Sequence, residues 1–297
     1  MKSRHILSEN AYEAWTEAVY YCKKIESGFI TLQYRKQFVA TLHNSVELLI
    51  KQHMLNVNDY RVVVFRKVKD NGEPAKSFYS SMDLNSFFIN NKEGMEKAYS
   101  VEFNKLVEYQ KTLFETYYDK NKGSLEIVNK GMELLKDLRN METHFYINGS
   151  KFLTDQEFIQ LYNFMLKFYE IQKEYHLLPF FGKPFGKSKN IAFEDNLPKN
   201  FTYKSAVKKS EYYDRIKARL NNQLCLSGDD SFAIINDLLE SYNDKPDDYI
   251  NYGNYNMILS YIESMLQMGL LTLKQETEEY ENEGERGYTV FDYYVFV

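Results

Sequence analysis

The sequence predicts a mainly helical protein, in which an antiparallel helical bundle with an inserted β-ribbon precedes a small α+β domain. Long stretches carry apolar residues at the i, i+3, i+4, i+7 spacing of a half-buried helix. Proline (5) and glycine (13) are scarce among 297 residues, so few positions interrupt a helix. Runs rich in β-branched and aromatic residues stand out at two places, shortly after residue 60 and at the end of the chain.

The first 176 residues hold most of the helical spacing. Thr154 with Glu157, and Asn10 with Glu13, have the spacing of a capping box, in which side chains at the start of a helix bind its unpaired amides. We therefore expect helices to begin at these two positions. The expected helical ranges are about 10–26, 34–55, 100–118, 123–138 and 154–175.

A short β-branched run interrupts the helices. Arg61–Val68 reads Arg-Val-Val-Val-Phe-Arg-Lys-Val and precedes Asp70-Asn71-Gly72, a turn signal. We interpret the run as one strand of a small hairpin or edge ribbon inserted between helices. Residues 1–176 are then an antiparallel bundle that carries this ribbon.

The composition changes after residue 177. Residues 182–219 hold ten Lys/Arg against four Asp/Glu, together with the densest glycine and proline of the chain. One interpretation is a basic strand that follows a phosphate backbone, with phenylalanines stacking on bases. The interpretation we prefer is a basic linker over 177–220.

Residues 221–297 are expected to form an acidic C-terminal domain. Residues 231–297 carry 13 Asp/Glu and 3 Lys/Arg, a net charge of −10, whereas the rest of the chain has a net charge of +5. The pattern of helix, helix, strand, loop and strand is that of the back half of a winged helix, but its expected second helix has no basic residue and its wing is acidic. It therefore favours protein over DNA as a partner; the alternative is an acidic cap packed on the bundle. The expected elements are helices 231–242 and 255–268, a strand from 269–273, an acidic loop 276–286 and a strand 287–295.

Composition also disfavours several classes of protein. Cys22 and Cys225 lie far apart without a Cys-x-x-Cys motif, and the five histidines are scattered. We therefore expect no metal site, no cofactor and no disulfide framework. The polar N-terminus and the lack of a long apolar run disfavour secretion and membrane spanning, so we expect a cytoplasmic protein that does not bind membranes.

Arg139, Asn140 and His144 form a compact polar cluster at the end of the helix expected from Gly123 to Leu138. Asn140 and His144 share one helical face, and Arg139 points about 140° away from His144. Arginine binds phosphate through its planar fork, and histidine titrates near neutrality. The cluster is therefore suited to holding a phosphate and moving a proton; the alternative is a solvated helix end.

Glu47 is a second candidate, because it interrupts an apolar stretch of the helix expected from 34 to 55. Two interpretations remain open. Glu47 could face a polar cluster between helices and support the candidate site, or it could pair with Lys51, four residues further along.

Arg139-Asn140-x-x-x-His144, preceded by the helix Leu42–Lys51, resembles the Arg-x4–6-His signature of the HEPN superfamily (higher eukaryotes and prokaryotes nucleotide-binding domains) over residues 8–176. The resemblance implies a bundle that dimerises and brings two Arg/His pairs into one cleft, as in metal-independent endoribonucleases. His144 would be the general base or acid for attack of an RNA 2′-OH on the adjacent phosphate. Arg139 would stabilise the transition state, and Asn140 would orient His144 or bind phosphate.

The resemblance also implies a biological role, that of a toxin or phage-defence effector acting on RNA such as tRNA or mRNA. Tyr146 extends the match to Arg-x4-His-x-Tyr, a form in which an antitoxin modifies the tyrosine; the alternative, which we prefer, is that Tyr146 packs in a tyrosine-rich chain. An antitoxin or sensor protein could bind through the acidic C-terminal domain. Two further alternatives remain, a non-catalytic HEPN module that binds nucleotide, RNA or a partner, and a helical structural protein without a site.

Overall fold

The computed structural model of the chain describes residues 6–65, 98–143, 153–177, 200–210 and 261–297 except 283–284, with positions 197, 213, 214 and 216–218. The chain divides into two compact units. The first consists of Met1–Cys22 and Gln37–Leu197, and the second of Lys23–Lys36 and Pro198–Val297. The protein is mainly helical, as the sequence predicts.

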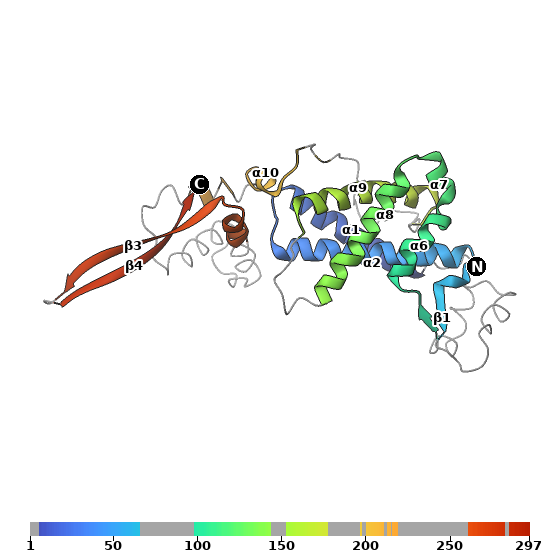
Figure 1. The fold of residues 1–297 in the computed structure, drawn as a ribbon, viewed down its shortest axis with the longest axis horizontal. Coiled ribbons are helices and arrows are strands. Elements are labelled where there is room, and N and C mark those ends of the chain that lie inside the picture. The colour runs from blue at the N-terminus through green and yellow to red at the C-terminus, as the bar shows by residue number, and fades with distance from the viewer. Residues whose placement is uncertain are drawn as a thin grey trace, which may run out of the picture. The chain divides into compact units, whose positions relative to one another are not determined.

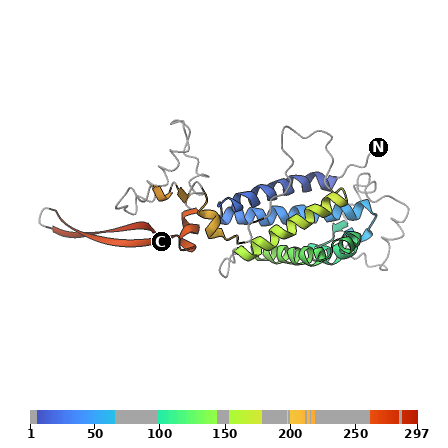
Figure 2. The same ribbon diagram turned by 90° about the horizontal axis from the view of Figure 1, so that it is seen from above.

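The first unit is a helical bundle, whose long helices lie side by side in Figures 1 and 2. Two hydrogen bonds link α1 to α2 in antiparallel order: the Leu7 amide donates to Gln52 Oε1 (3.0 Å), and the Ser45 hydroxyl donates to the Ala11 carbonyl (2.8 Å). The four long helices are α1 (Ile6–Glu26), α2 (Leu32–Asn56), α8 (Ser124–Thr143) and α9 (Asp155–Glu174).

Aromatic side chains fill the centre of the bundle. Phe38 of α2 lies against Phe158 of α9, with ring centroids 5.6 Å apart, and Trp15 of α1 lies 6.2 Å from Phe168 of α9. All four side chains are buried. Burying a large aromatic side chain contributes about 2–3 kcal/mol of hydrophobic free energy. The core therefore stabilises the bundle on the helical faces that the apolar spacing predicts.

The two capping-box predictions have different outcomes. Thr154 caps α9, with hydrogen bonds in both directions between Thr154 and Glu157, which confirms that prediction. The prediction for Asn10 is wrong, because α1 already begins at Ile6. The hydrogen bond from the Leu7 amide to Gln52 of α2 satisfies one of the first amides of α1, so tertiary contact extends this helix beyond its local signal.

A small ribbon leads into the next helices. β1 (Val63–Phe65) pairs in antiparallel register with β2 (Ala98–Ser100), in agreement with an inserted ribbon. The partner strand lies at residues 98–100, where the sequence analysis expected the start of a helix. A 3₁₀ turn (Tyr60–Val62) precedes the ribbon; α6 (Phe103–Leu113) and α7 (Glu115–Lys120) follow it.

The second unit contains a short helix and a long hairpin. α10 (Tyr203–Val207), which lies in the segment expected as a linker, begins with a capping box between Thr202 and Ser205. It packs against the turn between α1 and α2, where a Cβ on Gly28 (φ +100°) would lie 2.6 Å from the Ala206 carbonyl oxygen. Residues 261–267 are helical, in agreement with the helix expected over 255–268, and the helix expected over 231–242 lies outside the described residues.

The C-terminal hairpin is longer than expected. β3 (Leu271–Asn282) pairs along its whole length with β4 (Glu285–Phe296). The prediction of an acidic loop over 276–286 is therefore wrong, since most of that stretch is strand. Glutamate has a low β-propensity, but each glutamate of β3 is paired with a residue of β4, which is rich in aromatic and β-branched residues.

No helix in the described part of the chain has the length and apolar character needed to cross a membrane.

Gly131 sets the approach of α8 to α9. A Cβ at this buried position would lie 2.3 Å from Cγ of Phe164, closer than packed atoms allow. Gly131→Ala gains about 1 kcal/mol of helix propensity, but overpacking costs about 1–3 kcal/mol. We expect a net loss of up to about 2 kcal/mol in the free energy of unfolding, measured by urea denaturation.

Phe164→Leu provides the control, because a smaller side chain makes room for the new methyl group. In the double variant, the loss should be smaller than the sum of the two single losses. Additive losses would show that Gly131 and Phe164 are not in contact.

Candidate functional site

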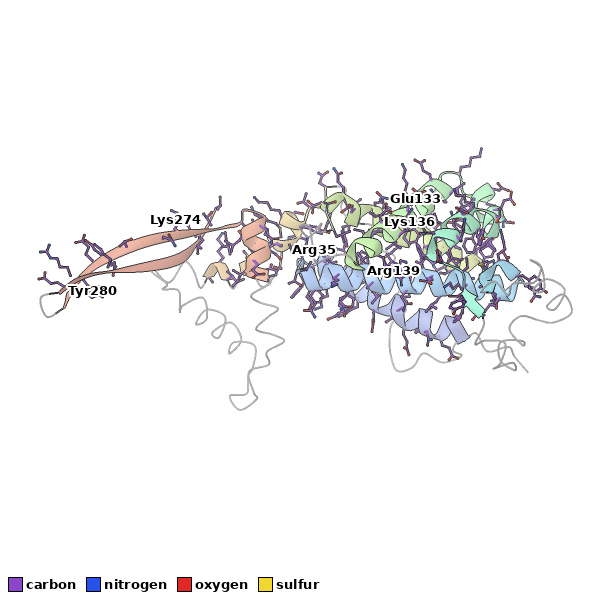
Figure 3. All side chains as sticks on the ribbon, turned by 60° about the horizontal axis from the view of Figure 1, so that its bottom comes forward. Arg35, Glu133, Lys136, Arg139, Lys274 and Tyr280 are labelled. Atoms are coloured by element: carbon purple, nitrogen blue, oxygen red, sulfur yellow. The ribbon has the colours of Figure 1, made fainter. Side chains whose placement is uncertain are left out.

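Arg139 lies near the C-terminal end of α8, and its side chain is 54% exposed. Figure 3 labels it over α2. Asn140 continues the same helix, but its side chain is outside the described atoms. His144 and Tyr146 lie outside the described residues. Of the residues predicted for the site, the structure therefore places the side chains of Arg139 and Glu47.

The structure brings Arg139 and Glu47 together. Nη1 of Arg139 lies 3.3 Å from Oε2 of Glu47, although 92 positions separate the two residues in the sequence. The other carboxylate oxygen, Oε1, accepts a hydrogen bond of 2.5 Å from Nζ of Lys51. Lys51 also donates to Oγ of Ser100, the last residue of β2, at 2.9 Å. The contacts thus form a chain, which we call the polar relay: Ser100, Lys51, Glu47 and Arg139.

The spacing of α2 produces this arrangement. His43, Glu47 and Lys51 follow one another at intervals of four residues, so they lie along one face of the helix. Their side chains are 4%, 19% and 6% exposed, respectively. The pairing of Glu47 with Lys51 is confirmed, and the same carboxylate also faces a polar cluster, because its other oxygen binds Arg139. The role of Glu47 in supporting an active site stays a prediction.

His43 belongs to the cluster, and the sequence analysis did not select it. Its ring lies 4.0 Å, centroid to centroid, from the ring of Phe103 in α6. Nη1 of Arg139 lies 3.3 Å from Nε2 and 3.5 Å from Nδ1 of His43. Such similar distances place the guanidinium nitrogen over the face of the ring, because in the ring plane it would collide with Cε1. The signal that could have identified His43 is its i, i+4 spacing to Glu47, which is followed at the same spacing by Lys51.

The surroundings of His43 keep its imidazole neutral. Burial, followed by the positive charge of Arg139, lowers the pKa of His43 from 6.5 to about 4, and Lys51 acts in the same direction. The carboxylate of Glu47 opposes these effects. A neutral ring avoids a third positive charge beside Arg139 and Lys51 and leaves a lone pair on one nitrogen. The cluster, with one carboxylate and two cations, then has a formal charge of +1.

The ion pairs of the cluster differ in energetic weight. Lys51 is almost fully buried, so its charge depends on Glu47 for compensation. Arg139 is mostly solvated, and an exposed ion pair contributes only about 0–1 kcal/mol. Arg139 can therefore exchange Glu47 for another anion at low cost, whereas Lys51 cannot. Chemically, the site offers an accessible guanidinium that is oriented by a buried polar support.

The described residues contain no group of three or more His, Cys, Asp or Glu side chains placed to hold a metal ion.

Comparison of the chain with protein-family models, curated proteins and solved structures finds no significant match. The resemblance to the HEPN superfamily therefore depends on the residues of this chain alone.

Two members of the polar relay, Glu47 and Arg139, should differ in their effect on stability. Glu47→Gln leaves the buried charge of Lys51 uncompensated, so we expect a loss of about 3 kcal/mol in the free energy of unfolding. Arg139→Gln removes a pair whose arginine is 54% exposed, so we expect a loss below about 1 kcal/mol from that pair. Urea denaturation at pH 7 measures both. Equal losses in the two variants would contradict the arrangement.

The pKa of His43 reports the geometry without any assay of activity. An NMR titration should place its midpoint at about 4. Arg139→Gln should raise this pKa because it removes a nearby positive charge, and Glu47→Gln should lower it because it removes a negative charge. A wild-type midpoint near 6.5 would show that His43 is not buried beside Arg139.

The same shift makes folding depend on pH. The unfolded chain binds a proton at His43 near pH 6.5, and the folded chain binds it near pH 4. Protonation of His43 therefore does not lower the free energy of unfolding above pH 6.5, and lowers it progressively as the pH falls from 6.5 to about 4.

Proposed function

We propose that the chain is a metal-independent endoribonuclease of the HEPN type that acts as a toxin or phage-defence effector. The observation that carries this proposal is the contact of Arg139 in α8 with Glu47 and His43 in α2. The two segments in contact are the two on which the resemblance depends. A helical protein without a site would not need an arginine held by a carboxylate and an imidazole at the surface.

Arg139 is suited to bind the scissile phosphate of RNA. Its guanidinium is accessible, and its pairing with Glu47 is weak enough to be replaced by a phosphate. Arginine binds phosphate through two parallel hydrogen bonds, and these strengthen as negative charge develops in the transition state. Lys51 lies at the inner side of Glu47 and keeps that carboxylate in place when Arg139 turns to the substrate.

The proton transfer is assigned to His144. His43 is a poor candidate because its side chain is 4% exposed and burial lowers its pKa to about 4, so a ribose 2′-OH cannot reach a basic nitrogen of suitable strength. In the proposed reaction, His144 takes the proton of the 2′-OH as this oxygen attacks the adjacent phosphorus. The bond from phosphorus to the 5′-oxygen breaks, and the 5′-oxygen takes a proton from water. The products are a 2′,3′-cyclic phosphate and a 5′-hydroxyl. Asn140 would orient His144 or bind the phosphate.

The proposed site is completed by a second copy of the chain. Arg139 and His144 are separated by about 140° around an ideal helix, so one helix presents them in different directions. In a homodimer, Arg139 of one copy can meet His144 of the other within one cleft. We place the enzyme in the cytoplasm, where RNA is available. The acidic C-terminal part is proposed to bind an antitoxin or sensor protein, and Tyr146 is the candidate for modification.

A test uses the full chain incubated with total RNA in the presence of EDTA. Wild-type protein should produce fragments that carry 5′-hydroxyl ends. His144→Ala and Arg139→Gln should each lower the cleavage rate by about 10²–10⁴-fold, because each removes a group that acts in the transition state. Both variants should keep the wild-type circular dichroism spectrum.

The matched control is His176→Asn, at an exposed position with φ +50°, which asparagine tolerates. This variant should cleave at the wild-type rate. Identical cleavage by the wild type and His144→Ala would identify a contaminating nuclease and would contradict the proposal. RNA binding that depends on Arg139 without any cleavage would instead identify a non-catalytic HEPN module.

A further inference from the structure

The strand β3 is exposed on both faces of the ribbon that it forms with β4. Its twelve residue pairs run from Leu271↔Phe296 to Asn282↔Glu285. Successive residues of a strand point to opposite faces, yet residues 272–275 and 277–281 of β3 are all exposed. Large apolar side chains are among them: Leu273 is 48% exposed and Tyr280 52%, as is Tyr288 of β4 at 66%.

A ribbon of this kind has little to hold it together. Two strands without a packed face are only marginally stable in water. One internal contact supports the register, because the ring of Tyr280 covers Gly287, where a Cβ would lie 2.4 Å from Cζ of the tyrosine. In the described residues, each strand has only the other as its neighbour. The outer edges of both strands therefore offer backbone amides and carbonyls for a further strand.

Charge selects the partner of the β3 edge. β3 carries four glutamates and one lysine, Lys274, so this edge is acidic. Polyphosphates are repelled by such a surface. A second β3 strand from another copy would bring its own glutamates with it, and like charges that face each other across strands are destabilising. A polypeptide with basic residues at alternate positions, by contrast, places lysines or arginines opposite the glutamate positions of one face. The glutamates of β3 are Glu276, Glu278, Glu279 and Glu281.

We propose that the outer edge of β3 is a docking site for an extended, basic segment of a partner protein, which adds to the ribbon as a third strand. Backbone hydrogen bonds supply affinity in this mode of recognition, and side chains at alternate positions supply specificity. Lysines of the partner segment would pair with the glutamates of β3, and its apolar residues would cover Leu273 and Tyr280. The third strand would also cover side chains of β3 that are exposed. The inference is independent of the proposed ribonuclease activity.

Binding to the full chain can be tested with synthetic peptides long enough to span β3. A peptide of alternating lysine and valine should bind at least about tenfold more tightly than one of alternating glutamate and valine, as measured by fluorescence anisotropy at low salt. It should also slow hydrogen exchange in β3, because the strand gains a hydrogen-bonded neighbour. The essential control is the lysine peptide with N-methyl groups at alternate residues, which keeps the charge but cannot form the ladder; it should bind at least about tenfold more weakly.

Variants of the chain locate the site. The double variant Glu278→Lys, Glu279→Lys should lose binding of the lysine peptide, since it reverses two charges on the β3 edge. The matched control is Glu126→Lys, Glu133→Lys, which reverses two exposed charges on α8 and should bind like the wild type.

Three results would overturn the proposal. Absence of binding by the lysine peptide would show that the edge is not a docking site. Equal binding of the N-methylated peptide would show that the attraction is electrostatic only. A ribbon-dependent dimer that excludes the peptide, detected by analytical ultracentrifugation, would identify a second copy of the chain as the occupant.

Discussion

The burial of Lys51 is the constraint around which the candidate site is organised. An ammonium group that is almost removed from water needs a carboxylate nearby and acceptors for its remaining protons. Glu47 and Ser100 meet these needs, so one side chain of α2 fixes both the neighbouring carboxylate and the end of β2. Glu47 in turn has only one oxygen left, and this oxygen holds Arg139. The orientation of the exposed guanidinium thus follows from the solvation of a buried amine.

The buried residues of the candidate site differ from its exposed residue in what they contribute to the fold. Lys51, Glu47 and His43 are mostly buried and contribute to the stability of the bundle, whereas Arg139 is exposed and contributes little to it. His43 limits the positions that the guanidinium of Arg139 can take on the side facing the core, because its ring is packed against Phe103. The ring acts as a platform, and its neutral state avoids repulsion of the arginine.

Local signals predicted those parts of the fold that local interactions determine. The capping box at Thr154 is complete within four residues, so the start of α9 could be predicted from the sequence. α1 begins before its expected cap because Gln52, 45 positions away, binds the Leu7 amide. β3 is a strand although glutamate has a low β-propensity, and the reason is again a partner distant in the sequence. Its glutamates pair with residues of β4, which is rich in aromatic and β-branched residues. In the site, Arg139 and Glu47 could be selected by residue type. Residue type did not single out His43. Its spacing to Glu47 was the one sequence signal, and its contacts with Phe103 and Arg139 depend on two other helices.

The pairing of β1 with β2 has a consequence for the history of the chain. Phe65 is paired with Ala98, so the two ends of the intervening sequence are held together by the ribbon itself. The entropy of closing a loop grows only slowly with its length, by about 0.6 kcal/mol for each doubling. Insertions and deletions between these two strands would therefore leave Ser100, and with it Lys51, where they are. Sequence changes between β1 and β2 are therefore expected to leave the contacts that lead from Ser100 to Arg139 in place.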